Sequence, residues 1–228
     1  MSLTKPSTVT RVVTGIRFRK VNDVFHLQVE QAELLPSATI DPNTKSWVKV
    51  EEYKTTDSDV SEGEDYNKLS WDLRSFELGD IELDKDYVVT GVRFTVDKGL
   101  TANEGLIRLD VRGTRFNFQN GKLKVKQHLW HQHTKSKDQL KQFKLEHTDL
   151  PPTHPINEDV SYSESSQYIT LTTSSMEQDV GQTVVPFVDL QPVVSEHPDV
   201  ALSGVGLFHK GYKKKAAGYL SVKILTYR

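Results

Sequence analysis

Three histidines within six residues, His128, His131 and His133, are the residues of this sequence whose spacing best suits a metal ion. On a β-strand, His131 and His133 would point to the same side, and paired imidazoles commonly bind Zn²⁺ or Cu²⁺. A third ligand would have to come from elsewhere, with His147, His154 and a carboxylate as candidates. No spacing singles one of them out, and a solvated basic segment beside a loop explains the same residues. We therefore assign no metal to the chain from its sequence.

Aromatic and histidine side chains form the second group of candidates, and they suggest a site for a small apolar or amphipathic ligand. Such sites need aliphatic and aromatic walls, with only a few polar groups at their ends. The candidate ligand-binding residues are Phe25, His26, Trp71, Phe116, Phe118, His209, Tyr212 and Tyr219. Among them, His26, His209 and Tyr212 could hydrogen-bond a polar end group, and a carotenoid or a lipid would fit this pattern. Ordinary packing in a core is the alternative for each aromatic side chain.

Residues that would carry out catalysis are not arranged in a recognisable motif. The chain has no cysteine, which excludes thiol nucleophiles, thiolate metal sites and disulfide bonds. It contains no serine nucleophile elbow, no phosphate-binding loop and no dinucleotide-binding fingerprint. We therefore predict that the protein is not an enzyme. No cofactor is assigned with certainty, and a carotenoid or lipid is the bound group that we consider.

The elements that must position these residues are β-strands, because one strand motif occurs three times. Its first copy reads VVTGIRF at residues 12–18, its second reads VVTGVRF at 88–94, and a weaker third reads ALSGVGL at 201–207. A second alternating run follows each copy, which indicates that a strand pair is the repeated structural unit. Strict alternation within each copy predicts that every second side chain is buried.

Three strand units predict an all-β fold, with a β-prism as the favoured architecture and a β-sandwich or barrel as alternatives. We expect a single domain over residues 1–228, because this length suits one β domain. The units are expected at about 10–54, 66–130 and 167–228. Polar or proline-rich insertions at 55–65 and 150–166 are expected to form loops. Trp71 lies in an alternating segment of the second unit, where we expect it to be buried.

Composition and charge restrict the partners and the location of the protein. The formal net charge is −2, so no overall positive field favours nucleic acid. No apolar stretch is long enough to span a bilayer, and no membrane span is expected. Residues 1–11 do not look like a signal peptide, which predicts a cytoplasmic protein unless the given chain is the processed form of a secreted one. Outward aromatic side chains could serve a subunit interface, and we expect a homo- or hetero-oligomer.

Several blocks of the sequence carry a family resemblance. They lie at residues 12–29, 65–71, 80–94, 182–191 and 202–211, and they include the segments DYNKLSW and QTVVPFVDLQ. The blocks are spread over most of the chain, which resembles a domain of unknown function found in secreted arthropod proteins. The resemblance implies an all-β, non-enzymatic protein in an extracellular location, and it brings no activity or site residues with it. The chain departs from the family pattern at residues 128–133, where extra histidines occur.

These observations together predict a non-catalytic binding protein whose ligand is small and apolar or amphipathic. A lectin-like protein that binds glycans is one alternative, since the faces of Trp47, Trp71 and Trp130 could stack on sugars. A structural protein that only associates with itself is the other alternative, and it would bind no small molecule.

Overall fold

A computed structural model of the chain shows an all-β protein, as the sequence predicts. It describes residues 11–98, 105–146, 148, 160–177, 181–195, 200–212 and 217–227. Within these residues the strands are β1 (Arg11–Val21), β2 (Val24–Leu34), β3 (Ile40–Trp47), β4 (Leu73–Glu82), β5 (Tyr87–Asp97), β6 (Gly105–Phe116), β7 (Leu123–His131), β8 (Lys141–Gln142), β9 (Val160–Tyr162), β10 (Gln167–Thr170), β11 (Thr172–Thr173), β12 (Val184–Val185), β13 (Phe187–Val188), β14 (Val193–Val194), β15 (Leu202–Tyr212) and β16 (Tyr219–Thr226). Helical structure there is limited to two 3₁₀ turns, at Pro36–Ala38 and Lys137–Gln139.

Each copy of the repeated motif lies in the first strand of an antiparallel hairpin, namely β1–β2, β5–β6 or β15–β16. The pairing shifts at the same point of each copy, where Thr14, Thr90 or Ser203 has no partner in the register. A shift of this kind is a β-bulge, which bends the strand and increases its twist. The three hairpins therefore share a local irregularity as well as a sequence motif.

The bulge explains a departure from the predicted alternation. Val12 and Val13 are adjacent in the sequence, yet both are fully buried, and the same holds for Val88 and Val89. Val13 and Val89 pack into the main core, whereas Val12 and Val88 pack into a second, smaller core. Strict alternation is therefore the wrong expectation at this point, because the bulge inserts a residue and the strand contacts two cores.

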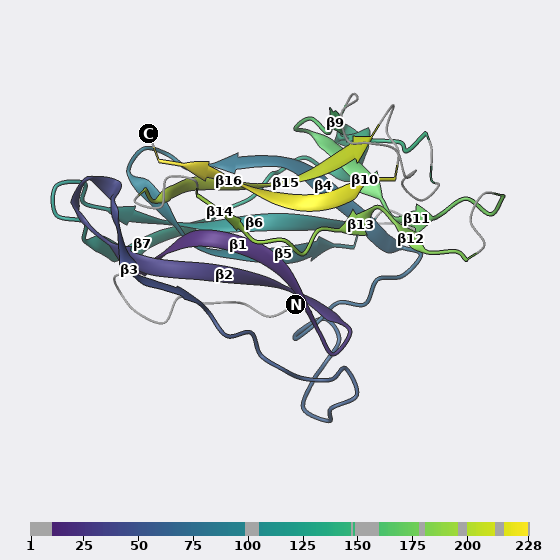
Figure 1. The fold of residues 1–228 in the computed structure, drawn as a ribbon, viewed down its shortest axis with the longest axis horizontal. Helices are drawn as coiled ribbons and strands as arrows, with labels where there is room; N and C mark the ends of the chain where they lie inside the picture. Colours follow the sequence, from purple (N-terminus) through teal and green to yellow (C-terminus); the bar gives the residue numbers. More distant parts are fainter. Residues whose placement is uncertain are drawn as a thin grey trace.

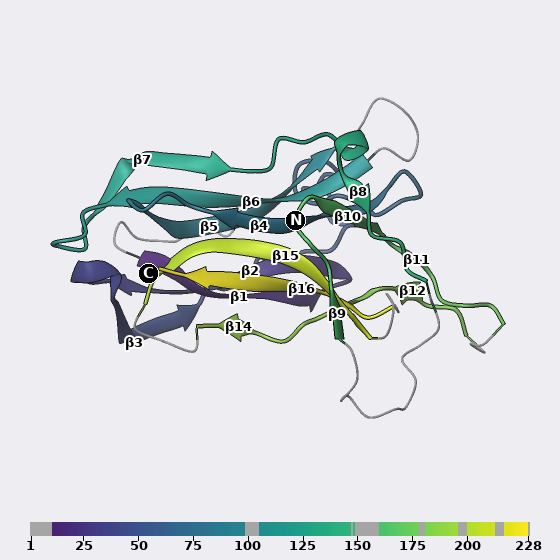
Figure 2. The same ribbon diagram turned by 90° about the horizontal axis from the view of Figure 1, so that it is seen from above.

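Strand β4 joins two of the hairpins in one sheet (Figure 1). Among the described strands, one sheet has the order β14-β1-β2-β3. A second sheet has ten strands. Six of them follow the order β13-β16-β15-β4-β10-β8, and β5, β6, β7 and β9 pair beside this path. In it, β4 pairs antiparallel with β15 and β10, and parallel with β6. In the perpendicular view, strands β4 to β7 form one layer, while β1, β2, β15 and β16 form another (Figure 2).

The main hydrophobic core lies between these layers and receives side chains from all three hairpins. Ile16, Val92 and Val205 occupy the same position of the three copies, and each is at most 1% exposed. The rings of Phe18 and Phe94 stack with their centroids 6.0 Å apart. Removal of these aliphatic and aromatic side chains from water is the main force that holds the hairpins together.

The arrangement does not establish the three-sheet prism that the repeats suggest, because β4 places two hairpins in one sheet. Residues 55–65 form turns and bends with mostly exposed side chains. The segment 150–166 lies largely outside the described residues, and its last part contains β9. In the described part of the chain, no helix has the length and apolar character needed to cross a membrane.

Candidate binding site

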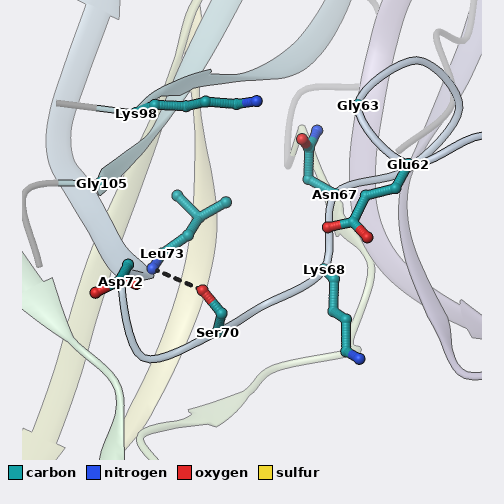
Figure 3. Close-up of a pocket in the computed structure, with 9 residues that line it drawn as sticks. All are labelled: Glu62, Gly63, Asn67, Lys68, Ser70, Asp72, Leu73, Lys98 and Gly105. Atoms are coloured by element: carbon teal, nitrogen blue, oxygen red, sulfur yellow. Dashed lines mark hydrogen bonds between the residues drawn. The ribbon is translucent and has the colours of Figure 1, made fainter. Parts of the chain in front are cut away.

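A polar hollow of about 510 Å³ lies where the segment between β3 and β4 approaches the ends of β5 and β6 (Figure 3). Its lining consists of Glu62, Gly63, Asn67, Lys68, Ser70, Asp72, Leu73, Lys98 and Gly105. Most of these residues precede β4, whereas Lys98 follows β5 and Gly105 begins β6. Among the described residues, no predicted ligand-binding side chain lines the hollow, but Trp71 stands between two residues that do.

Trp71 belongs to a tight turn before β4 whose other residues, Ser70, Asp72 and Leu73, line the hollow. The backbone N–H groups of Ser70 and Leu73 each donate to the other residue's carbonyl oxygen, at 3.1 and 3.2 Å. The Ser70 hydroxyl accepts a further bond from the Leu73 N–H at 3.2 Å. Gly105 donates its N–H to the Asp72 carbonyl oxygen at 3.1 Å, and a side chain on Gly105 would overlap that oxygen. The turn is thus fixed to β6 at a contact that only glycine allows.

The indole of Trp71 is 68% exposed, so the expectation that it is buried is wrong. The reason is that β4 begins only at Leu73, and Trp71 belongs to the turn that precedes the strand. The Arg74 guanidinium lies 3.7 Å from the ring centroid, and its Nε donates to the Trp71 carbonyl oxygen at 3.2 Å. This cation–π contact orients the indole from one face and leaves the other face accessible.

The acidic loop that forms one wall of the hollow is ordered by its own hydrogen bonds. The Ser61 N–H donates to the Asp65 carboxylate at 2.8 Å, and the Asp65 N–H donates to the Ser61 carbonyl oxygen at 3.0 Å. The Tyr53 hydroxyl donates to the Asp65 carbonyl oxygen at 2.9 Å. Burial raises the pKa of Tyr53, which keeps this donor protonated at neutral pH. The loop therefore presents Glu62 and Gly63 in a defined conformation.

The lining offers hydrogen-bonding groups of each kind. The Glu62 and Asp72 carboxylates accept, the Lys68 and Lys98 ammonium groups donate, and the Asn67 amide does both. Asp72 and Lys98 lie on one side of the hollow, and the other three residues lie on the opposite side (Figure 3). Hydroxyl groups can both donate and accept, so a ligand with several hydroxyls could use donors and acceptors of this lining.

The other two tryptophans have a structural role beside arginines of the repeats. Arg17 lies 4.3 Å from the ring centroid of Trp47, and Arg93 lies 4.1 Å from that of Trp130. The two pairs are equivalent, because the tryptophans pair with corresponding positions of β2 and β6. Trp71 differs from both, since it precedes its strand and its ring is mostly exposed.

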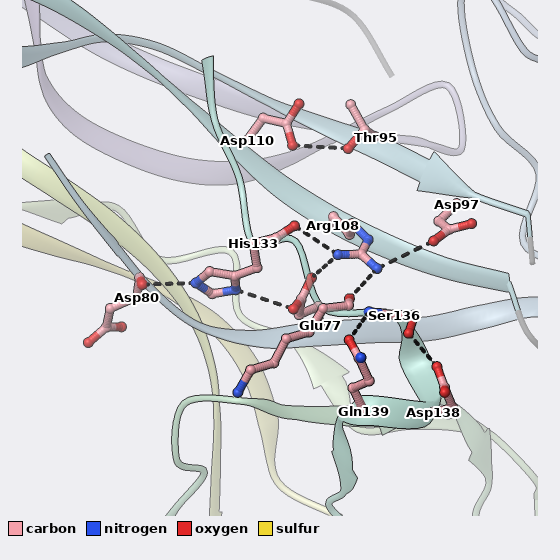
Figure 4. A network of polar contacts seen from close by, with 11 residues as sticks. Glu77, Asp80, Thr95, Asp97, Arg108, Asp110, His133, Ser136, Asp138 and Gln139 are labelled. Atoms are coloured by element: carbon pink, nitrogen blue, oxygen red, sulfur yellow. Dashed lines mark hydrogen bonds and ion pairs between the residues drawn. The ribbon is translucent and has the colours of Figure 1, made fainter. Parts of the chain in front are cut away.

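A buried network of charges links β4, β5, β6 and the residues after β7 (Figure 4). Arg108 and Glu77, whose side chains are 9% and 3% exposed, form an ion pair at 3.1 Å. Arg108 also contacts the Asp97 carboxylate at 3.3 Å and donates to two carbonyl oxygens after β7, at 2.9 and 2.6 Å. A buried arginine is tolerated here because its charge is paired and its N–H groups find acceptors.

His133 is the histidine of this network. Its Nδ1 lies 3.3 Å from a Glu77 carboxylate oxygen, and its Nε2 lies 3.0 Å from the Asp80 carbonyl oxygen. Both partners are acceptors, so the doubly protonated imidazolium satisfies both contacts. The interaction with Glu77 is the main cause that raises the pKa of His133. Lys223 pairs in turn with the Asp80 carboxylate at 2.7 Å.

Three of the predicted ligand-binding residues are buried in cores. His26, Phe116 and His209 are 1%, 4% and 0% exposed. His209 donates its Nε2–H to the Ala217 carbonyl oxygen at 2.8 Å, and its ring packs on Phe143 with centroids 4.8 Å apart. Burial lowers the pKa of both histidines, which favours their neutral forms. The surroundings of these residues match the ordinary packing that we considered as the alternative.

The remaining predicted residues lie at separate places. Phe118 and Tyr219 are 51% and 45% exposed, on the turn after β6 and at the start of β16. Phe25 is partly buried on β2. The Tyr212 side chain lies outside the described residues. With Trp71 beside the hollow, the structure does not gather the predicted residues into one site.

The three histidines considered as metal ligands are not brought together either. His128 is exposed, and its Nδ1 donates to a backbone carbonyl oxygen at 2.8 Å. The ring of His131 packs against a tyrosine, and His133 belongs to the charge network. In the described part of the chain, no three His, Asp or Glu side chains are placed to hold a metal ion. His147 and His154 lie outside that part.

Comparisons with known proteins do not place the chain in a family. The sequence matches no protein-family model, and no curated protein is significantly similar to it. The function therefore has to be argued from the geometry and chemistry of the site.

Sequence reasoning missed the polar lining of the hollow, because Glu62, Asn67 and Lys98 lie in stretches that are typical of solvated loops and strand ends. One feature of the sequence does indicate that Trp71 is exposed. Trp71 stands between a serine and an aspartate, which favour turns. A tryptophan within such a turn is a candidate for exposure, and exposure of a large aromatic side chain indicates a binding surface.

Proposed function

We propose that this chain is a non-catalytic binding protein and that the polar hollow beside Trp71 binds a saccharide. The turn from Ser70 to Leu73 carries the proposal, because it contains the exposed and oriented indole of Trp71, and its residues Ser70, Asp72 and Leu73 line the hollow. These features favour the glycan-binding alternative over an apolar ligand at this place.

A saccharide has two kinds of surface, and the hollow offers a partner for each. The C–H face of a sugar ring can stack on an aromatic ring, and Arg74 holds the indole of Trp71 in one orientation. The sugar hydroxyls need donors and acceptors, which Glu62, Asn67 and Lys98 supply (Figure 3). Because the turn is already ordered, less conformational entropy is lost on binding.

Non-catalytic binding is supported by the way in which the buried ionisable side chains are used. Glu77, Arg108 and His133 contact one another between strands, and His26 and His209 are neutral core residues. An enzyme tends to gather groups of altered pKa at its site, whereas here these histidines lie in packed regions.

The proposal is tested with a glycan array, followed by calorimetry on the saccharide that gives the strongest signal. We expect Trp71→Ala to weaken the affinity about tenfold or more, because a central aromatic contact is lost. Its melting temperature should stay within about 2 °C of the wild type, since the side chain is exposed.

The matched control is Phe118→Ala, which removes a similarly exposed aromatic ring at the other end of β6. This variant should bind the saccharide as the wild type does. An array without signal would contradict the proposal, and so would an equal loss of affinity in both variants.

An apolar ligand is the second candidate, and a different region favours it. At the far end of β6, Phe116, Phe118 and Tyr227 form an aromatic cluster with ring centroids 5.6 to 6.3 Å apart. The exposed half of Phe118 offers a surface that a carotenoid- or lipid-like molecule could cover. Native mass spectrometry with an absorption spectrum, on protein from its natural source, tests this candidate. A bound molecule that absorbs light, seen in the wild type and missing in Phe118→Ala, would support this candidate. Detection of the protein without any bound molecule would count against it.

The fold and the location complete the proposal. The shared bulge of the three hairpins supports one domain of three related units, near 10–54, 66–130 and 167–228, in a prism-like arrangement. The resemblance to a domain of secreted arthropod proteins supports an extracellular location. Exposed aromatic side chains such as Phe118 support an oligomer, which sedimentation of the native protein would test.

A further inference from the structure

The hairpin β6–β7 is strongly basic within a chain that is slightly acidic overall. The 27 residues between Asp110 and Asp138 contain seven lysines and arginines and no aspartate or glutamate, whereas the whole chain has a net charge of −2. A block of one sign in a nearly neutral chain indicates a surface for a partner of the opposite sign.

Strand β7 carries Lys124, Lys126 and His128 within five residues. The two lysines lie in a bulge, because residues 124–127 have no partner in the register between Leu123 and His128. All three are exposed, and so is Lys122 just before the strand. Among the described residues, no aspartate or glutamate pairs with these lysines. The charges are therefore available to a ligand.

The position of β7 at a sheet edge makes the side chains of Lys124, Lys126 and His128 accessible. Among the described strands, β7 pairs only with β6, and its side chains between Lys124 and Leu129 are exposed on both faces. Lysines on an edge strand also prevent unwanted pairing between chains, but one or two charges of either sign are sufficient for that purpose. Edge protection therefore does not explain why acidic residues are missing from the part of β6 after Asp110, from β7 and from the segment that follows.

We propose that the β6–β7 hairpin binds an acidic polysaccharide through Lys124, Lys126 and His128. A short, exposed cluster of cations without an acidic partner fits a polyanion, and short lysine-rich segments are typical of heparin-binding patches. Nucleic acid fits less well, because single-stranded nucleic acid is bound through aromatic rings on which the bases stack. Trp130 is the aromatic ring on this side of β7, and the Arg93 guanidinium occupies a face of it, 4.1 Å from its centroid.

Heparin is the probe for this site, in affinity chromatography and in calorimetry at low and moderate salt. The wild-type protein should bind, and its affinity should fall as salt rises, because counterions are released on binding. Lys124→Glu/Lys126→Glu should weaken binding about tenfold or more. The matched control is Lys49→Glu/Lys54→Glu, which makes the same change of net charge at two other exposed lysines. It should bind heparin within about twofold of the wild type.

Thermal melts establish that both variants are folded, which is expected because all four lysines are exposed. The proposal is overturned if the wild type does not bind heparin, or if the control variant loses as much affinity as the test variant. It is also overturned if polyuridylate RNA binds as tightly as heparin, which would assign the surface to nucleic acid. Trp71→Ala should leave heparin binding unchanged, so the tests of this surface and of the hollow can fail independently.

Discussion

The first two hairpins, β1–β2 and β5–β6, share one backbone pattern but bury different polar side chains at equivalent positions. Gln28 and Asp110 correspond, and each accepts a hydrogen bond from the arginine of its repeat, at 2.7 and 2.9 Å. Two residues earlier, the first hairpin has His26 and the second has Arg108. His26 is buried with its neutral form favoured, whereas Arg108 is buried as a cation beside Glu77.

The difference follows from the segments that lie next to each hairpin. Strand β6 pairs with β4, which places Glu77 3.1 Å from Arg108. Strand β3 takes the place beside β2 that β7 takes beside β6, and among the described strands β2 has no counterpart of β4. The His26 ring instead meets the ring of Tyr53, with centroids 5.7 Å apart. A repeated backbone thus sets where a side chain lies. Neighbours from other segments then decide whether a charge can be buried there.

Removal of Glu77 should have the largest effect, because it breaks this arrangement in the second hairpin. Glu77→Ala leaves the Arg108 cation buried without its main counter-charge, and we expect a loss of about 3–5 kcal/mol in the free energy of unfolding. His26 occupies the position of the first hairpin that corresponds to Arg108, and His26→Leu should cost less than about 1.5 kcal/mol, since a neutral ring is replaced by an apolar group. Urea denaturation measures both. A smaller cost for Glu77→Ala than for His26→Leu would show that the ion pair does not hold the charge in place.

The glycines of the repeats extend the comparison to the third hairpin. A Cβ on Gly204 would overlap the backbone carbonyl oxygen of Ile81, whereas a Cβ on Gly15 would lie 2.7 Å from a methyl group of Val194. A side chain can rotate away and a paired strand cannot. Gly204→Ala should therefore cost about 2–4 kcal/mol, and Gly15→Ala about half of that or less. Equal losses in urea denaturation would mean that the neighbouring strand is no more rigid at Gly204 than at Gly15.

These contrasts also show which parts of the structure the sequence can predict. The strands follow from the repeated apolar motif, because burial of one face needs that pattern. The bulge at Thr14 does not follow, since alternation carries no sign of a residue that is skipped in pairing. The pairing of β4 with two hairpins is equally hidden, because contacts between distant segments determine it. The ion pair of Glu77 and Arg108 is hidden for the same reason, whereas the turn at Trp71 has a local signal in Ser70 and Asp72.

The arginine–tryptophan contacts should be energetically alike in the two hairpins, and the effect is expected to be modest. Double-mutant cycles on Arg17 with Trp47, and on Arg93 with Trp130, should each give a coupling energy of about 0.5–1 kcal/mol. Similar values are expected because both pairs have the same register and similar distances. A coupling near zero in one cycle alone would show that the equivalence is limited to geometry.

The histidines sharpen the comparison through the pH dependence of stability, where the smallest effects are expected. The pKa of His133 is raised above its ordinary value of 6.5, so its contribution is present below pH 6.5 and is lost as pH rises through the folded-state pKa. The pKa of His26 is lowered, so its contribution is present above pH 6.5 and is lost as pH falls through the folded-state pKa. Melting temperatures should be measured from pH 5 to 9. Compared with the wild type, His133→Gln should show a weaker dependence on pH above pH 6.5, and His26→Leu should show a weaker dependence below it. His209 acts in the same direction as His26, so the acid slope should be reduced and not abolished. The exposed His128→Gln is the control, and a change of slope in it as large as in His133→Gln would contradict the assignment.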